Sequence, residues 1–245
     1  MTMHPLAGLA DAIFIINLPY RADRRAEMGA ELARLGLGLD DPRVRLFEAV
    51  RPEDAGEFPS IGARGCFMSH LGVLRAANAQ GLKSVLILED DADFTPEFVK
   101  LGAEALGAVA AGPWDILYLG YAAEISAGGG EPQSGRIREV APALAIRLTH
   151  AMIVRGAAIA RIADYLEKMA ARRGGDKAGG PMHVDGAYSW FRRDNRDIVT
   201  AIAAKPWAVQ RASATDIHDT GWKERIPFLG AARKIRNRLF KRRSA

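Results

Sequence analysis

A short apolar run, residues 84–88, leads directly into four carboxylates within five positions. These are Glu89, Asp90, Asp91 and Asp93. Such a run, rich in Val, Leu and Ile, is typical of a strand that is buried on both faces of a parallel sheet. In open α/β sheets, ligands bind at the carboxyl ends of the strands, where these carboxylates would lie. The segment therefore predicts an α/β fold with a functional site beside this strand.

Crowded carboxylates repel one another and are costly to remove from water unless a cation neutralises them. Hard divalent ions such as Mg²⁺ and Mn²⁺ take oxygen ligands, and substrate phosphates often complete their coordination. The first hypothesis is a metal-assisted site for a phosphorylated substrate. The alternative, a solvated acidic loop that caps a helix, stays open at this point.

Strand-like and helix-like segments alternate along most of the chain. Strands are expected at residues 12–18, 44–50, 84–88, 114–120 and 143–154 and within 198–209. Helices are expected from Asp23 to about Gly36, and at residues 66–80, 95–111 and 157–171. Loops are expected at 52–65, 123–139 and 172–180, where Gly, Pro or charged residues dominate. The alternation predicts a mainly parallel sheet with helices on both faces, in a single Rossmann-like domain spanning residues 1–227.

Cys66 is the single cysteine of the 245 residues, so an intrachain disulfide is excluded and a reducing compartment is expected. Its apolar neighbours predict a small core residue. The N-terminal apolar stretch has no basic flank and is interrupted by Asp11, so we do not expect a signal peptide. No segment has the length of a membrane span. The sequence therefore predicts a cytoplasmic protein.

Residues 228–245 form a basic tail. Ala231 to Ala245 contain seven Lys or Arg and no acid, so the first 230 residues carry about −2 of the net charge of +5. Apolar residues recur at helical spacing in the tail, which suits an anionic membrane surface at the inner face of the membrane. A solvated terminus is the alternative. Nucleic acid is not an expected partner because no binding motif is present.

Several short motifs, taken in this order, resemble glycosyltransferase family 25, which includes bacterial lipooligosaccharide galactosyltransferases and the collagen galactosyltransferases. They are residues 15–18 with Arg21 and Asp23-Arg24, residues 65–70, 86–91, 149–154 and 181–185, Gln210, and residues 213–217. The resemblance implies a GT-A-type fold, a nucleotide-sugar donor, a divalent metal and inversion at the anomeric carbon. It further implies transfer of a hexose such as galactose, from a donor such as a UDP-sugar. The acceptor would be a glycan or lipid-linked saccharide in cell-surface polysaccharide or lipopolysaccharide biosynthesis.

A metal that bridges carboxylates and a diphosphate would absorb the charge that builds on the leaving phosphate. Asp91 and Asp93 are two residues apart, so an extended segment turns them to the same side, and they are the first candidate ligands of Mn²⁺ or Mg²⁺. Asp90 is the next candidate, because a turn could present it instead. Glu89 would contact a sugar hydroxyl or support the metal ligands. From the resemblance, His218 would be an additional ligand, and a solvent-exposed histidine is its alternative.

Donor contacts are expected from two other segments. Arg21 and Arg24 follow the first strand and could bind the diphosphate, or simply begin a solvated helix. In the resemblance, Asn17 and Leu18 would contact the base or ribose. Further along, Ser69 and His70 lie on an expected helix, where a buried structural role competes with contact to the donor.

Inverting transfer needs one base that removes the proton of the acceptor hydroxyl. Asp185 follows an expected loop and is the first candidate for this role. A helix cap for the residues after it is the alternative.

Two other function classes remain open from the sequence. A metal-dependent phosphohydrolase also places Asp residues after an apolar strand, but its nucleophilic Asp and supporting Lys motifs cannot be assembled here. A non-catalytic nucleotide-sugar-binding protein would keep the fold and lose the base.

Overall fold

The computed structural model describes residues 5–122 and 136–211. The main sheet contains β1 (Ala12–Asn17), β2 (Val44–Glu48), β3 (Ser84–Glu89), β5 (Ile116–Tyr118), β6 (Ile137–Glu139), β7 (Ala151–Arg155) and β8 (Thr200–Ala203). A second, two-stranded sheet contains β4 (Ala92–Phe94) and β9 (Ala208–Gln210). The helices are η1 (Pro5–Gly8), α1 (Ala22–Arg34), α2 (Ile61–Ala79), α3 (Pro96–Val99), α4 (Ala103–Ala110), α5 (Ala158–Ala170) and α6 (Val184–Asp194).

The seven strands of the main sheet follow the order β2-β1-β3-β7-β5-β8-β6. β1 is parallel to both β2 and β3, and β5 is parallel to β8. β7 is antiparallel to both of its neighbours, β3 and β5, so these two share one direction. Five strands therefore run one way, and β7 and β6 run the other way. The predicted α/β class with a mainly parallel, helix-flanked sheet is confirmed.

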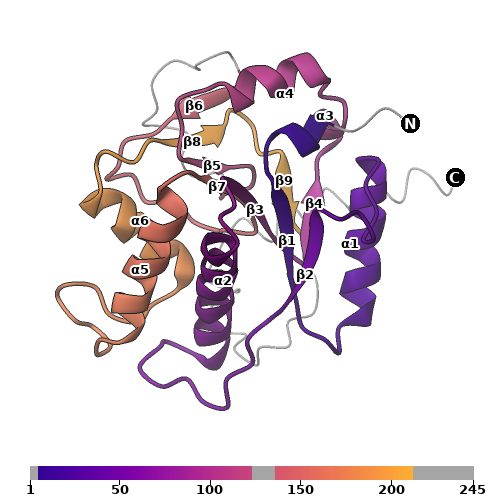
Figure 1. Ribbon diagram of the computed structural model, residues 1–245. Helices are drawn as coiled ribbons and strands as arrows, with labels where there is room; N and C mark the ends of the chain where they lie inside the picture. Colours follow the sequence, from indigo (N-terminus) through magenta and orange to yellow (C-terminus); the bar gives the residue numbers. More distant parts are fainter. Residues whose placement is uncertain (1–4, 123–135, 212–245) are drawn as a thin grey trace, which may run out of the picture. The chain divides into compact units, whose positions relative to one another are not determined.

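Helices cover both faces of the sheet because successive crossovers run in opposite directions across it. The chain moves from β1 outward to β2 through α1, and then returns past β1 to β3 through α2. Figure 1 shows α1 on one side of β1 and β2, and α2 with α5 and α6 on the other side. This arrangement leaves the carboxyl ends of β1, β2 and β3 together at one edge, where no crossover helix lies between them.

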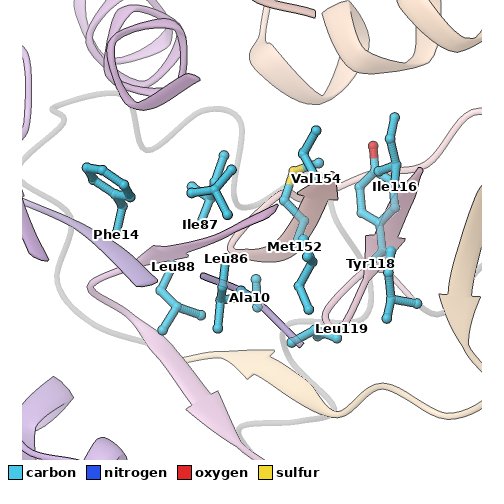
Figure 2. Packing of buried hydrophobic residues seen from close by; sticks show 14 of the residues in the cluster. Ala10, Phe14, Leu86, Ile87, Leu88, Ile116, Tyr118, Leu119, Met152 and Val154 are labelled. Atoms are coloured by element: carbon cyan, nitrogen blue, oxygen red, sulfur yellow. The ribbon is translucent and has the colours of Figure 1, made fainter. Parts of the chain in front are cut away.

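The core is built on the alternation of side chains along each strand. Phe14, Ile87, Met152 and Tyr118 form one row across four neighbouring strands, as the register of the pairs shows. Figure 2 shows Phe14 and Ile87 on one face of the sheet, and Leu86 and Leu88 on the other. All of these side chains are nearly or fully buried. β3 is therefore apolar on both faces, as its sequence predicts.

Some predicted boundaries are wrong. α2 begins at Ile61 rather than near Cys66, because the Ser60 hydroxyl accepts the Ala63 N–H and caps the helix five residues earlier. In α1, Asp23 is not the cap but a residue of the first turn. Thr95 is the expected cap, yet its helix α3 ends at Val99 and α4 starts again at Ala103.

The second half of the chain shows further differences. The strand predicted for residues 143–154 covers only 151–155, and residues 141–149 are irregular, with the carbonyls of Ala141 and Leu144 accepting hydrogen bonds from Arg192 of α6. The loop predicted for 123–139 contains β6 at its end. α6 begins at Val184 and His183 is its N-cap, so Asp185 lies in the first turn and the alternative prediction that it caps the helix is wrong. The expected strand near Pro206 is two strands, β8 and β9, in two different sheets.

Contacts divide the chain into a compact unit, Met1–Gln210, and the remainder from Arg211. The predicted tail, residues 228–245, lies outside the described residues and stays a prediction. Within residues 5–122 and 136–211, no helix combines the length and the apolar character that crossing a membrane requires.

Candidate functional site

The carboxyl ends of β1 and β3 are joined by a buried polar network. Asp90 follows β3 and is only 6% exposed. One of its oxygens accepts the amide Nδ2–H of Asn17 at 2.8 Å, and the other forms an ion pair with Arg24 at 2.8 Å. Asn17 ends β1 and Arg24 lies in the first turn of α1. The structure therefore brings together three of the predicted site residues, from segments up to 73 positions apart.

Two neighbouring arginines hold this network in place. Arg25 was not predicted as a site residue, but its guanidinium donates to the Asn17 Oδ1 at 3.2 Å and to the Pro19 carbonyl. Arg21 donates twice to the exposed carboxylate of Asp23, and this contact holds the pKa of Asp23 well below its usual range. Because Asn17 Nδ2 also donates to the Arg21 carbonyl, the turn after β1 is closely tied to Asp90.

A pocket of about 500 Å³ lies beside this network, at the carboxyl ends of β1 and β2. It is lined by Leu18, Pro19, Tyr20, Glu48, Ala49, Val50 and Arg51. The ring of Tyr20 is 53% exposed, and the Arg51 guanidinium lies 5.3 Å from its centre. Leu18 was predicted to contact the donor, whereas Tyr20 and Arg51 were missed. An exposed aromatic ring next to a cation offers a surface on which a planar group can stack.

Asp91 and Asp93 follow Asp90 in the acidic turn and in β4. Asp91 is 7% exposed, and its carboxylate accepts the side-chain amide of Gln210 at 3.2 Å. Asp93 is paired in register with Val209, so β9 fixes the backbone of this segment. Gln210 appeared among the sequence motifs, but its contact with Asp91 could not be predicted.

The resemblance implies a divalent metal at these residues, and the donor set fits one. Asp91 and Asp93 offer carboxylate oxygens, which are the ligands that Mg²⁺ and Mn²⁺ prefer, while Asp90 is committed to Arg24 and Asn17. Two carboxylates suffice for such an ion when substrate phosphates and water supply its other ligands. His218, the third predicted ligand, lies outside the described residues.

Glu89, the last residue of β3, points into a second polar cluster. Its carboxylate accepts the hydroxyl of Thr149 at 3.1 Å and lies 3.4 Å from the Nε2 of His70. Burial opposes ionisation of Glu89, but His70, His150 and Thr149 favour the charged form and leave its pKa below the ordinary value. Glu89 therefore carries its charge at neutral pH.

His70 is fully buried on α2, and its Nδ1 lies 3.3 Å from the hydroxyl of Tyr188 on α6. Cys66 lies one helical turn before it. Low-polarity surroundings raise the pKa of the Cys66 thiol, and the carboxylates of Glu89, Asp185 and Asp91 raise it further. The sequence indicated Cys66 only as a core residue. Its spacing of four from His70 was the signal that could have identified a shared helix face.

Ser69, which was predicted as a donor contact, is buried, and its hydroxyl is used by the backbone. It accepts the Val50 N–H at 2.8 Å and donates to the Gly65 carbonyl at 2.7 Å. It thereby ties α2 to the segment that lines the pocket.

Asp185 lies in the first turn of α6 and is half-buried. Its two oxygens accept the N–H of Gly186 at 2.7 Å and the N–H of Leu148 at 3.2 Å. Leu148 is the single non-glycine residue with positive φ, 70°, among the described residues. Asp185 thus holds an uncommon backbone conformation, and its charge also raises the pKa of Cys66 and Tyr118.

Comparison with known proteins gives the same family as the motifs. The family model described as "Glycosyltransferase family 25 (LPS biosynthesis protein)" matches residues 10–124. This match contains β1, the pocket segment, α2 and the acidic turn.

Curated relatives match a similar part of the chain. A "Glycosyltransferase 25 family member" of Aedes aegypti is 31% identical over 125 residues, which cover 44% of this chain and 21% of the relative. An "Inactive glycosyltransferase 25 family member 3" of Homo sapiens is 30% identical over 134 residues, which cover 45% and 22%. A "Procollagen galactosyltransferase 1-B" of Xenopus laevis is 26% identical over 128 residues, which cover 45% and 21%. The match thus spans about a fifth of the length of these relatives.

Among solved structures, the chain is similar to a glycosyltransferase involved in glycosylation of the major capsid of PBCV-1. The identity is 12% and the TM-score 0.38, with 83% of this chain and 95% of that chain covered.

Proposed function

Residues 10–124 are a glycosyltransferase family 25 segment, and from this premise we propose that the chain transfers a hexose from a nucleotide sugar to a saccharide acceptor. Galactose from a UDP-sugar is the proposed donor group, and a glycan or lipid-linked saccharide is the proposed acceptor. The reaction would invert the anomeric carbon, with Mn²⁺ or Mg²⁺ as cofactor. Lipopolysaccharide or another cell-surface polysaccharide is the proposed product class.

The observation that carries this proposal is the position of the acidic turn. Asp91 and Asp93 follow β3 at the edge where the carboxyl ends of β1 and β2 also lie, and the pocket opens at that same edge. In open α/β sheets, this edge is where nucleotides bind. A divalent ion held there would neutralise the charge that develops on the leaving diphosphate.

Different residues would bind the nucleotide base, hold the acidic turn in place and remove the acceptor proton. The pocket beside Tyr20 and Arg51 is large enough for a nucleotide base, which could stack on the exposed ring. Arg24 and Asn17 hold Asp90, so the acidic turn is fixed in one position before any donor arrives. Asp185, half-buried in the first turn of α6, would accept the proton of the acceptor hydroxyl at a carboxylate oxygen.

A non-catalytic nucleotide-sugar-binding protein is the second candidate. It is favoured by one observation, the human relative whose name describes it as inactive. Both candidates bind a donor, so binding and turnover have to be measured separately.

The proposed function is tested by thermal unfolding of the full chain with a panel of UDP-, GDP- and CMP-sugars. Each donor is added with Mn²⁺, with Mg²⁺ and with excess chelator, and free galactose is the control without a nucleotide. Because a ligand that binds the native state stabilises it by mass action, we expect one nucleotide class to raise the melting temperature when metal is present. The same donor should release free sugar slowly in a metal-dependent hydrolysis.

The outcomes of this experiment distinguish the transferase from the non-catalytic binding protein. Stabilisation with metal-dependent hydrolysis supports the transferase. Stabilisation without hydrolysis, and without transfer to any saccharide offered, favours the non-catalytic protein. If no nucleotide sugar changes the melting temperature at millimolar concentration, the proposed function is wrong.

A further inference from the structure

Three different metal-binding side chains meet between α2 and the end of β3. Cys66 and His70 are four positions apart on α2, so they share one face of the helix. Glu89 reaches them from the end of β3. The Sγ of Cys66, an imidazole nitrogen of His70 and a carboxylate oxygen of Glu89 all lie within 4.8 Å of one another. Within residues 5–122 and 136–211, this is the one group of three or more such ligands.

The imidazole of His70 gives an independent indication of a ligand. The side chain is 0% exposed, and its Nδ1 lies against the Tyr188 hydroxyl. The Nε2 is directed toward Glu89 at 3.4 Å, which is long for a hydrogen bond, and the atom has no hydrogen-bond partner among the described residues. A buried polar atom in this position is costly unless a ligand completes its environment.

We propose that Cys66, His70 and Glu89 bind one zinc-class divalent ion and leave its fourth position open. Zinc binds thiolate, imidazole and carboxylate ligands together, and open zinc sites have three protein ligands. Mg²⁺ and Ca²⁺ prefer all-oxygen ligand sets, so this group of side chains selects against them. On binding, the Cys66 thiol loses its proton to solvent and the sulfur forms the bond to the metal.

Neighbouring polar side chains position two of the three proposed ligands. The Tyr188 hydroxyl contacts the Nδ1 of His70 and orients its ring, and the Thr149 hydroxyl donates to the Glu89 carboxylate. His70 and Glu89 are therefore each positioned by a neighbouring polar group. Cys66 and Glu89 are each partly exposed, and His70 is buried.

This proposal does not depend on the proposed function, because it concerns different donor atoms. The acidic turn offers carboxylates alone, whereas the cluster contains the single thiol of the chain. A spectroscopic signal from metal–thiolate bonding therefore reports on this site and on no other.

The test is titration of the untagged, reduced full chain with Co²⁺, which replaces Zn²⁺ in tetrahedral sites. We expect a cobalt–thiolate charge-transfer absorption that saturates at one equivalent and disappears when Zn²⁺ is added. In the wild-type chain, saturating Zn²⁺ should also slow the reaction of Cys66 with a thiol reagent by roughly tenfold or more, since the metal-bound thiolate is withheld from the reagent.

Variants identify the ligands. Cys66→Ser should abolish the absorption, and His70→Gln or Glu89→Gln should weaken Co²⁺ binding at least roughly tenfold, the usual loss when a shell residue is removed. His183→Gln is the matched control, since His183 is half-buried but outside the cluster, and it should bind Co²⁺ as the wild type does. Circular dichroism and thermal unfolding establish that each variant is folded.

Two results would overturn the proposal. One is the absence of a thiolate absorption, or of thiol protection by Zn²⁺, in the folded wild-type chain. The other is an unchanged Co²⁺ affinity in folded His70→Gln and Glu89→Gln, which would reduce the cluster to a hydrogen-bonded part of the core.

Discussion

Asp90, Asp91 and Asp93 are adjacent in the sequence, but their environments differ. Asp90 is paired with Arg24 and accepts a hydrogen bond from Asn17, so its charge is already compensated within the protein. Asp91 accepts a side-chain amide, which carries no charge. At the scale of single residues, the structure therefore separates a carboxylate that fixes the turn from the carboxylates proposed to hold a metal.

Asp91→Asn or Asp93→Asn is expected to abolish Mn²⁺-dependent hydrolysis of the donor, because an amide cannot supply the negative charge that a hard cation requires. The melting temperature should change little, since Asn is nearly the same size as Asp. Donor hydrolysis is followed with and without excess chelator, and Asp164→Asn, an exposed residue of α5, serves as the control. Full activity in both variants would rule out the acidic turn as the metal site.

Asp185→Asn is expected to lower transfer by roughly two to four orders of magnitude, the usual contribution of a general base. Donor affinity should stay close to that of the wild type, because Asp185 lies on α6 and the pocket lies at β1 and β2. Steady-state kinetics with varied donor separate the two effects. If donor binding falls in parallel, the contact of Asp185 with Leu148 is structural and the base lies elsewhere.

At the scale of an element, α2 carries Cys66 and His70 of the second polar cluster and is packed close to the segment after β2. A Cβ atom on Gly65 would lie 2.7 Å from the backbone carbonyl of Val50, and the Ser69 hydroxyl bonds to the Val50 N–H. Gly65 is therefore required by close approach rather than by a special backbone angle. The position of Cys66 and His70 depends on this contact.

Gly65→Ala is expected to destabilise the protein by about 1–3 kcal/mol, because the added methyl group meets a backbone atom that cannot turn away. The matched control is Gly107→Ala in α4, where a Cβ would meet nothing within 4 Å. That change should be stabilising by about 0.5–1 kcal/mol, since alanine has the higher helix propensity. Urea unfolding of both variants measures the difference. Equal free energies of unfolding would show that α2 can move away from Val50 at no cost.

At the scale of the whole molecule, charge is distributed unevenly along the chain. The net charge of +5 comes from the last fifteen residues, which contain seven Lys or Arg and no acid. A lipid-linked acceptor would be found at a membrane surface, and each basic residue near an anionic surface contributes about 1 kcal/mol of binding. The tail thus offers a means of bringing the site to such an acceptor.

Deletion of residues 228–245 is expected to release the protein from anionic vesicles while transfer to a soluble acceptor stays largely unchanged. Vesicle co-sedimentation at rising salt measures the effect, because screening should weaken binding of the full-length chain. Neutral phosphatidylcholine vesicles are the control. Equal binding of the two forms to anionic vesicles would mean that the tail is not a membrane anchor.

Local sequence patterns were sufficient for several features of the fold. The apolar run of β3, the acidic turn after it and the Thr95 cap depend on neighbouring residues alone, and the structure contains all three. The α/β class followed from the alternation of strands and helices. The prediction for β7 failed where a distant contact decides the outcome, whereas the early start of α2 follows from a local signal, the Ser60 cap, that the sequence analysis did not use.

By itself the sequence determined which residue types stand at the end of β3, since side-chain periodicity is a property of the local chain. Only the tertiary structure decided which distant residues contact these side chains. Asp90 is hydrogen-bonded to Asn17, which lies 73 positions earlier in the sequence. Glu89, at the end of β3, lies beside Cys66 and His70 of the preceding helix α2. Such contacts depend on how the crossovers place β1 and α2 against β3, and this geometry is set by packing over the whole sheet.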